Sequence, residues 1–111
     1  MITIWHNPRC SKSRQTLALI EDRDVTIRKY LEDAPTVEEI RAARDALGMG
    51  AIEMMRVKEK VFKELGLSRT DDDEILIAAM AENPVLIERP IVFANGKAAI
   101  GRPPEAVLEI L

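Results

Sequence analysis

The sequence has one cysteine and one histidine in 111 residues. A single cysteine excludes an internal disulfide, a CxxC redox pair and a zinc site made of several cysteines. Long apolar runs are also missing, since the uncharged run at 75–81 is far too short to span a bilayer. The first residues, 1–5, lack the basic start and long apolar stretch of a secretory signal. We therefore expect no membrane-spanning segment. The remaining question about Cys10 is whether it is a buried core residue or a reactive one.

The charge balance is slightly acidic. The chain has 16 Lys and Arg against 19 Asp and Glu, a net charge of −3 and a pI near 5.2. This balance disfavours a general nucleic-acid binder and a polybasic membrane anchor. Hydrophobic residues make up 47% and charged residues 32%, which is typical of a globular fold and excludes disorder. Length and composition predict a single domain over 1–111.

The first third of the chain predicts a βαβ unit. Apolar residues at 2–5 indicate a short buried strand, and Pro8 lies in the loop that ends it. Residues 11–21 favour a helix. Residues 25–30 then alternate between apolar and polar, as in a second strand. Two strands joined by one helix should lie parallel, with a right-handed connection.

The middle of the chain is helical in pattern. Thr36 and Glu39 have the spacing of a capping box, and Gly48 is placed to end that helix. Further helices are expected near 57–65 and from about 70 to 82. We interpret this block as an insertion between two halves of one small sheet.

The last third predicts a ββα unit. Short extended runs fall at 85–87, 91–93 and 98–100, and Asn95-Gly96 forms a strong hairpin signal between the last two. Pro103-Pro104 can open a final helix. The fold class is therefore α/β: a small mixed β-sheet flanked by helices, with a helical insertion between the βαβ and ββα halves.

Cys10 has two interpretations. A lone cysteine is often a small buried hydrophobe. Cys10, however, follows a strand and a proline-containing loop, directly precedes a helix, and has cationic or polar neighbours: Arg9, Ser11, Lys12, Ser13 and Arg14. A helix N-terminus and nearby cations stabilise the nucleophilic thiolate, and the same N–H groups can hold a tetrahedral oxyanion. We therefore predict a reactive cysteine.

Three arginines are candidate ligands for such an oxyanion. Arg56 follows an apolar stretch, Arg89 precedes Pro90, and Arg102 precedes Pro103-Pro104. The fork of donors on a guanidinium matches an oxyanion in a way that a lysine does not. Each arginine could equally be a solvated surface charge, and spacing alone does not show that they converge.

The remaining polar candidates have open roles. His6 either orients the loop, helps to hold the Cys10 thiolate, or makes one backbone bond at a strand end. The Ser13 hydroxyl either donates to the Cys10 sulfur or caps the helix. The acidic run at 71–74 is explained by a helix N-terminus and lacks the ligand spacing of an EF-hand, so no metal is expected.

At these residues the chain resembles the arsenate reductase family of the glutaredoxin-dependent type, which has a thioredoxin-like fold. The pattern H-N-P-x-C-x-x-S-R of its active-site loop is intact at 6–14. Further matches follow in order along the whole chain, at 30–32, 35–36, Arg56, the R-P-I-V segment 89–92 and the R-P-x-E segment 102–105. The resemblance implies a thioredoxin/glutaredoxin-like fold in which Pro90 is the cis-proline beside the active site.

The resemblance also implies a mechanism. The Cys10 thiolate attacks the arsenic of arsenate, which is held by Arg56, Arg89, Arg102 and helix N–H groups. Glutathione then attacks the cysteine–arsenic adduct, and a glutaredoxin completes the reduction and releases arsenite. Supporting residues are His6, Ser13, Arg14 and Pro90. Glutathione is a co-substrate and no cofactor is bound, and the need for reduced thiols implies a cytoplasmic protein that serves arsenic detoxification.

Two other functions share this fold. An Spx-like transcription regulator that binds RNA polymerase typically carries a CxxC switch, which Cys10 and Ser13 cannot form. A monothiol oxidoreductase acting on glutathione mixed disulfides would keep Cys10, and would use the arginines for glutathione carboxylates or not at all. Gly101 is a local departure, because some family members have a further cysteine there.

Overall fold

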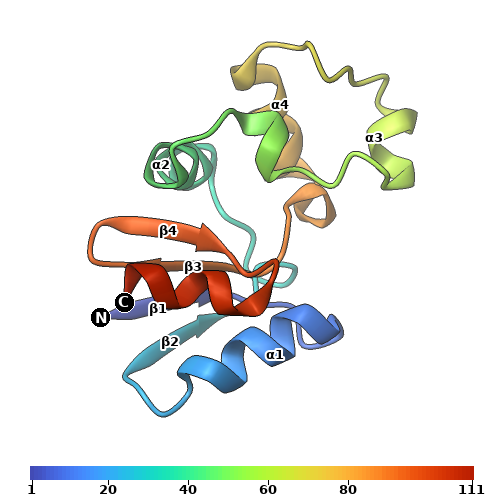
Figure 1. Ribbon diagram of the computed structural model, residues 1–111. Coiled ribbons are helices and arrows are strands. Elements are labelled where there is room, and N and C mark those ends of the chain that lie inside the picture. Colours follow the sequence, from blue (N-terminus) through green and yellow to red (C-terminus); the bar gives the residue numbers. More distant parts are fainter. The chain divides into compact units, whose positions relative to one another are not determined.

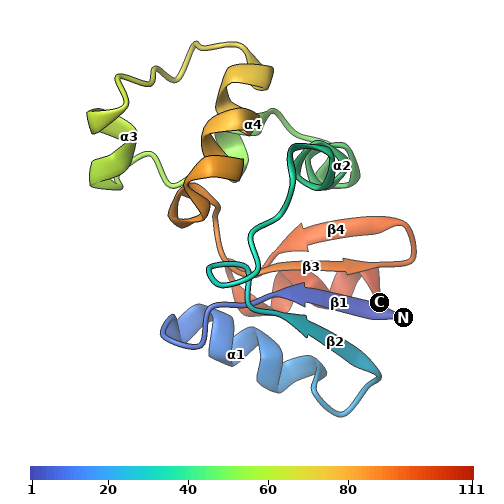
Figure 2. The same cartoon turned by 180° about the vertical axis from the view of Figure 1, so that it is seen from behind.

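The computed structural model describes all 111 residues, and the chain divides into two compact units. The first comprises Met1–Asp33 and Arg89–Leu111, and it contains the whole β-sheet (Figures 1 and 2). The second comprises Ala34–Glu88 and is the helical insertion that the sequence predicts. That 1–111 forms a single domain stays a prediction. None of the helices is both long and apolar enough to cross a membrane.

The sheet of the first unit has four strands in the order β2-β1-β3-β4. Strand β1 (Ile2–Trp5) pairs in parallel with β2 (Val25–Arg28), which confirms the predicted βαβ unit. On its other side β1 pairs antiparallel with β3 (Ile91–Ala94), and β3 pairs antiparallel with β4 (Lys97–Ile100). The sheet is therefore mixed, as predicted, and its central pair joins two distant parts of the chain.

Helix α1 (Ser11–Ile20) and the 3-10 helix η3 (Pro104–Ile110) contact each other and pack on the sheet (Figure 1). Their apolar residues meet those of β1 and β3 in a core cluster of fully buried side chains: Ile4, Ile20, Val92 and Val107. Burying a side chain of this size contributes about 1.5–3 kcal/mol. This core fixes α1, whose N-cap is Cys10, against β1 and β3.

The β3–β4 hairpin has the predicted two-residue turn. Asn95 (φ 54°) and Gly96 (φ 73°) both have positive φ, as a type I′ turn requires. The Asn95 amide also donates to the Ile110 carbonyl at 2.8 Å, so the turn is tied to the last residues of η3.

The second unit is built from α2 (Val37–Leu47), η1 (Ala51–Met54), α3 (Lys60–Glu64), α4 (Asp73–Glu82) and η2 (Pro84–Leu86). The predicted capping box begins α2: the Thr36 hydroxyl accepts from the Glu39 N–H at 3.1 Å, and the Glu39 carboxylate accepts from the Thr36 N–H at 2.9 Å. Gly48 ends the helix in the left-handed conformation, with φ 68°.

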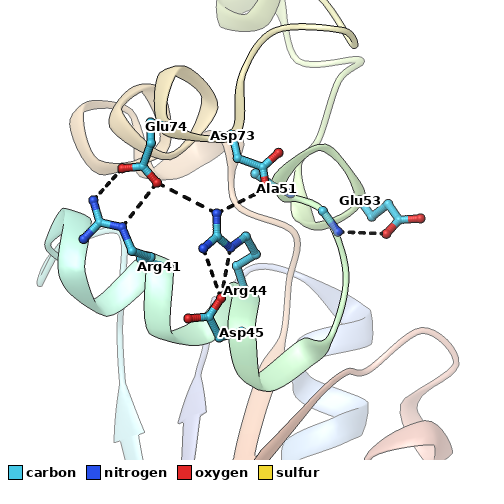
Figure 3. A network of polar contacts seen from close by, with 8 residues as sticks. Arg41, Arg44, Asp45, Ala51, Glu53, Asp73 and Glu74 are labelled. Carbon is cyan, nitrogen blue, oxygen red and sulfur yellow. Dashed lines mark hydrogen bonds and ion pairs between the residues drawn. The ribbon is translucent and has the colours of Figure 1, made fainter.

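An ion-pair network links three elements of this unit (Figure 3). Arg41 and Arg44 of α2 both reach Glu74 of α4. Arg44 also pairs with Asp73 at 3.2 Å, and the same Asp73 oxygen accepts from the Ala51 N–H at the start of η1. Because these groups are solvent-accessible, the network orients α2, η1 and α4 more than it stabilises them.

Several predicted boundaries differ from the structure. The run 85–87 was expected to be extended, but Pro84 opens a 3-10 turn at Pro84–Leu86, and Ile87 alone makes an isolated bridge to Met55. That expectation is wrong because proline fits the first position of a helical turn. The predicted helix at 57–65 shortens to Lys60–Glu64, and the final helix is of the 3-10 type. Strand β2 ends at Arg28, two residues early.

Candidate active site

The loop 6–10 is held by backbone bonds at both ends. The His6 N–H donates to the Arg28 carbonyl at 2.8 Å, which extends the β1–β2 pairing by one residue. Asn7 then folds the loop, because its carbonyl accepts from the Cys10 N–H and its side-chain oxygen accepts from the Arg9 N–H, each at 3.0 Å. Cys10 is thereby placed at the N-cap of α1, with extended backbone.

The Cys10 sulfur faces donors from three segments of the first unit. At the helix start the backbone N–H groups of Lys12 and Ser13 face it and lower its pKa. The Arg89 side chain donates to it from the residue before β3. The Arg102 Nη2 atom, just after β4, lies 3.8 Å from it. The structure therefore brings together Cys10, Arg89 and Arg102, a convergence that the spacing in the sequence does not show.

These donors outweigh the effect of burial on ionisation. Burial disfavours the thiolate and by itself raises the pKa of Cys10, which is only 9% exposed. The Ser13 N–H, the Arg89 side chain with its positive charge, and the Lys12 N–H act in the opposite direction. The net result is a pKa of Cys10 below its ordinary value, which increases the thiolate fraction at neutral pH.

The two arginine segments are bonded to each other. The Gly101 N–H donates to the Pro90 carbonyl at 3.0 Å, and the Arg102 Nε donates to the Arg89 carbonyl at 2.9 Å. The Arg89–Pro90 peptide bond is cis, which confirms the expectation for Pro90. The Arg102–Pro103 bond is also cis, a feature that no motif in the sequence indicates.

Arg56 belongs to the second unit. Its Nε and Nη2 atoms both donate to one Glu59 carboxylate oxygen, at 3.0 and 2.8 Å, and its Nη1 lies 3.6 Å from Glu88. Its backbone N–H donates to the Leu86 carbonyl at 2.8 Å. The guanidinium is thus oriented by two carboxylates from its own unit.

His6 and Ser13 form a buried pair beneath the loop. The Ser13 hydroxyl lies 2.6 Å from His6 Nδ1 and accepts from the Asn7 N–H at 3.0 Å. The Ser13 hydroxyl therefore holds the loop through His6 and Asn7. Burial, followed by the positive charges of Lys29 and Arg14, lowers the pKa of His6, so the ring is neutral at neutral pH.

The model of the ArsC family matches residues 5–110 of this chain. The chain belongs to the ArsC family. This family has the thioredoxin-like fold, so the predicted fold class is confirmed. The match includes the loop, the cysteine and all three arginines described above.

Related ArsC proteins cover nearly the whole chain. A protein of Neisseria meningitidis named arsenate reductase is 47% identical, over 99% of this chain and 97% of its own length. One of Haemophilus influenzae with the same name is 46% identical, over 99% and 98%. The solved structure of an arsenate reductase from Vibrio cholerae is 54% identical, covers 99% of this chain and 97% of its own, and superposes with a TM-score of 0.95.

Two features of this ArsC site were missed by sequence reasoning. Asn7 organises the loop through both its carbonyl and its side chain, whereas the sequence pattern singled out only Pro8 in this loop. Gly101 packs where no side chain would fit, which no sequence pattern reveals. Arg14, expected to be a supporting residue, donates to the Pro8 carbonyl at 3.0 Å and so braces the same loop.

Proposed function

We propose that the protein is an arsenate reductase that uses Cys10 as its nucleophile. The observation that carries the proposal is the convergence of Arg89, Arg102 and the first N–H groups of α1 on the Cys10 sulfur. An activated thiolate beside donors that match a tetrahedral oxyanion is the arrangement this chemistry requires. The names of the Neisseria, Haemophilus and Vibrio relatives support arsenate as the substrate.

The first step joins sulfur to arsenic. Arg89 and Arg102 hold the arsenate oxygens, and the Cys10 thiolate attacks the arsenic atom. An S–As bond forms and one As–O bond breaks, and the departing oxygen leaves as water after taking up protons. Arsenic stays in the pentavalent state in this step, so Cys10 by itself performs no reduction.

The electrons come from outside the chain, because Cys10 is the only cysteine. In the proposed sequence glutathione attacks the arsenic of the adduct, so that a second S–As bond forms and another arsenic oxygen leaves as water. The glutaredoxin thiol then attacks the glutathione sulfur: a mixed disulfide of the two external thiols forms, the S–As bond to glutathione breaks, and its electron pair reduces arsenic by two electrons. Water finally displaces the Cys10 sulfur from arsenic, which releases arsenite and returns the Cys10 thiolate. Glutathione is thus a co-substrate, no cofactor is held permanently, and a cytoplasm with a reduced thiol pool is the proposed location.

Arg56 is the third proposed arsenate ligand. Its guanidinium is oriented by Glu59 and Glu88, so its direction is set before any substrate arrives. His6, Ser13 and Arg14 are proposed to act indirectly, by keeping the loop 6–10 in the shape that presents the sulfur.

The test is arsenate-dependent oxidation of NADPH in the presence of glutathione, glutaredoxin and glutathione reductase. We expect turnover by the wild type and none by Cys10→Ser. Absence of turnover by the wild type, or equal turnover by both proteins, would contradict the proposal. A second measurement separates this function from a monothiol oxidoreductase, which needs no oxyanion. In an arsenate reductase, bound arsenate should slow the alkylation of Cys10, whereas in a monothiol oxidoreductase it should have no effect.

A further inference from the structure

Gly101, directly after β4, occupies a position that has no room for a side chain. A Cβ atom built there would overlap the Thr16 hydroxyl oxygen and would lie 2.8 Å from Pro90 Cγ and 3.1 Å from Thr16 Cγ2. The glycines with positive φ are Gly48, Gly66 and Gly96, so Gly101 is not required for an unusual backbone conformation. The position requires glycine because the side chains of Thr16 and Pro90 lie so close to its backbone.

On one side of this contact lie the two arginines that face the sulfur. The Gly101 N–H is bonded to the Pro90 carbonyl, and the next residue, Arg102, is bonded through Nε to the Arg89 carbonyl. From the same residue the Nη2 atom reaches the Cys10 sulfur at 3.8 Å. A displacement of Gly101 would therefore move both arginine-bearing segments together.

On the other side lies the helix that carries the sulfur. Thr16 is fully buried on α1, and its hydroxyl donates to the Lys12 carbonyl at 2.8 Å. Lys12 in turn supplies one of the backbone N–H groups that face Cys10. Thr16 is therefore coupled to the turn that faces the thiolate, and it cannot rotate away from Gly101 without losing its hydrogen bond to Lys12.

We propose that Gly101 is a positioning residue, whose missing side chain lets the Arg89 and Arg102 segments pack against Thr16 closely enough for both guanidiniums to reach the Cys10 sulfur. The inference rests on the proposed function in one respect, that the Cys10 thiolate is the working nucleophile. A side chain at Gly101 separates the arginines from the sulfur without altering any group that touches it.

The experiment measures the rate of Cys10 alkylation by iodoacetamide as a function of pH, in the full-length protein. In Gly101→Ala we expect the rate curve to move to higher pH and alkylation at neutral pH to become roughly tenfold slower, as a displaced charged donor implies. The matched control is Gly50→Ala, because a Cβ at Gly50 meets nothing within 4 Å and its φ is −73°. That variant should keep the wild-type curve.

Two further variants separate positioning from simple packing. Gly101→Ala combined with Thr16→Ala removes the Thr16 Oγ1 and Cγ2 contacts and keeps the Pro90 Cγ contact at 2.8 Å, so it should restore part of the wild-type rate. Thr16→Ile crowds the same contact from the helix side and should slow alkylation while Gly101 is kept. If Gly101→Ala does not fold, Thr16→Ile tests the proposal in its place. A purely structural role would lower the melting temperature and leave the pH curve in place, and that result in a folded variant overturns the proposal.

Alkylation requires no arsenate, so this inference and the proposed function fail separately. If the wild type does not turn over arsenate but Gly101→Ala shifts the alkylation curve, the positioning role stands and the proposed substrate is wrong. If the wild type turns over arsenate and the folded variants keep the wild-type curve, the positioning role alone is overturned.

Discussion

At the scale of single residues, the chemistry depends on a competition at Cys10. Burial works against the charged sulfur, and the donors of α1 and Arg89 work for it. Because the donors prevail, a modest loss of donation should be enough to return the thiol to its ordinary behaviour.

Removing the Arg89 guanidinium tests this competition directly. In Arg89→Ala we expect the pKa of Cys10 to rise and alkylation at neutral pH to slow roughly tenfold, because a hydrogen bond to a charged group contributes about 1.5–3 kcal/mol. The rate of iodoacetamide alkylation against pH measures the effect. Arg23→Ala, at an exposed turn, is the control and should leave the curve unchanged. An unchanged curve in Arg89→Ala would show that α1 and Arg102 activate the sulfur without Arg89.

The lowered pKa of His6 predicts that the free energy of unfolding depends on pH. Its pKa is lowered from 6.5 in the folded protein, so below pH 6.5 the unfolded chain binds more protons at this residue than the folded one. Its contribution is therefore present above pH 6.5 and is lost as the pH falls. In urea unfolding at several pH values, the stability difference between the wild type and His6→Gln should shrink on acidification. A constant difference would contradict the lowered pKa.

At the scale of elements, the sequence predicts helix caps and tight turns correctly, because these depend on neighbouring residues. It does not predict contacts between distant segments. The capping box of Thr36 and the turn at Asn95-Gly96 each depend on residues within three positions of each other, and both are confirmed. The run 85–87 was misread because its apolar residues are equally suited to a strand, while Pro84 decides for a helical turn. Neighbouring residues predict an element correctly only where the hydrogen bonds that define the element join residues close together in the sequence.

The α2 cap offers a measurable case of such a local bond. Thr36→Ala should lower the free energy of unfolding by about 1 kcal/mol, because the Glu39 N–H loses its acceptor at the helix N-terminus. Chemical denaturation measures this change. Thr36→Ser keeps the hydroxyl and is expected to retain most of the stability. Equal losses in the two variants would assign the effect to the methyl group and not to the cap.

At the scale of the whole molecule, the candidate site could be predicted from the sequence only in part. The sequence indicated Cys10, Arg89 and Arg102 separately, by the helix start and by the prolines beside the arginines. Their meeting depends on β1 and β3 pairing across most of the chain, which no local pattern encodes. The Gly101 contact depends on the same pairing and on the helix above it, so only the folded chain reveals it.

Binding of an oxyanion should stabilise the entire fold. In Cys10→Ser, where no adduct can form, arsenate at about 100 times its dissociation constant should add about 2.7 kcal/mol, since it binds only the native state. The melting temperature should rise accordingly, and the rise should be largely lost in Cys10→Ser combined with Arg102→Ala. A rise of equal size in both proteins would place the bound arsenate away from Arg102.

The order of strands in the sheet also bears on how the protein is made. Strand β1 is synthesised before its partner β3, which follows only after the whole insertion, Ala34–Glu88. Until then β1 has β2 on one edge and an open edge on the other, while the insertion, continuous in sequence, can already be complete. Closing the sheet must therefore be a late, long-range event in biosynthesis. The nascent chain displays an unpaired edge of the kind that chaperones protect, and the thiol of Cys10 gains its arginines only at that last step.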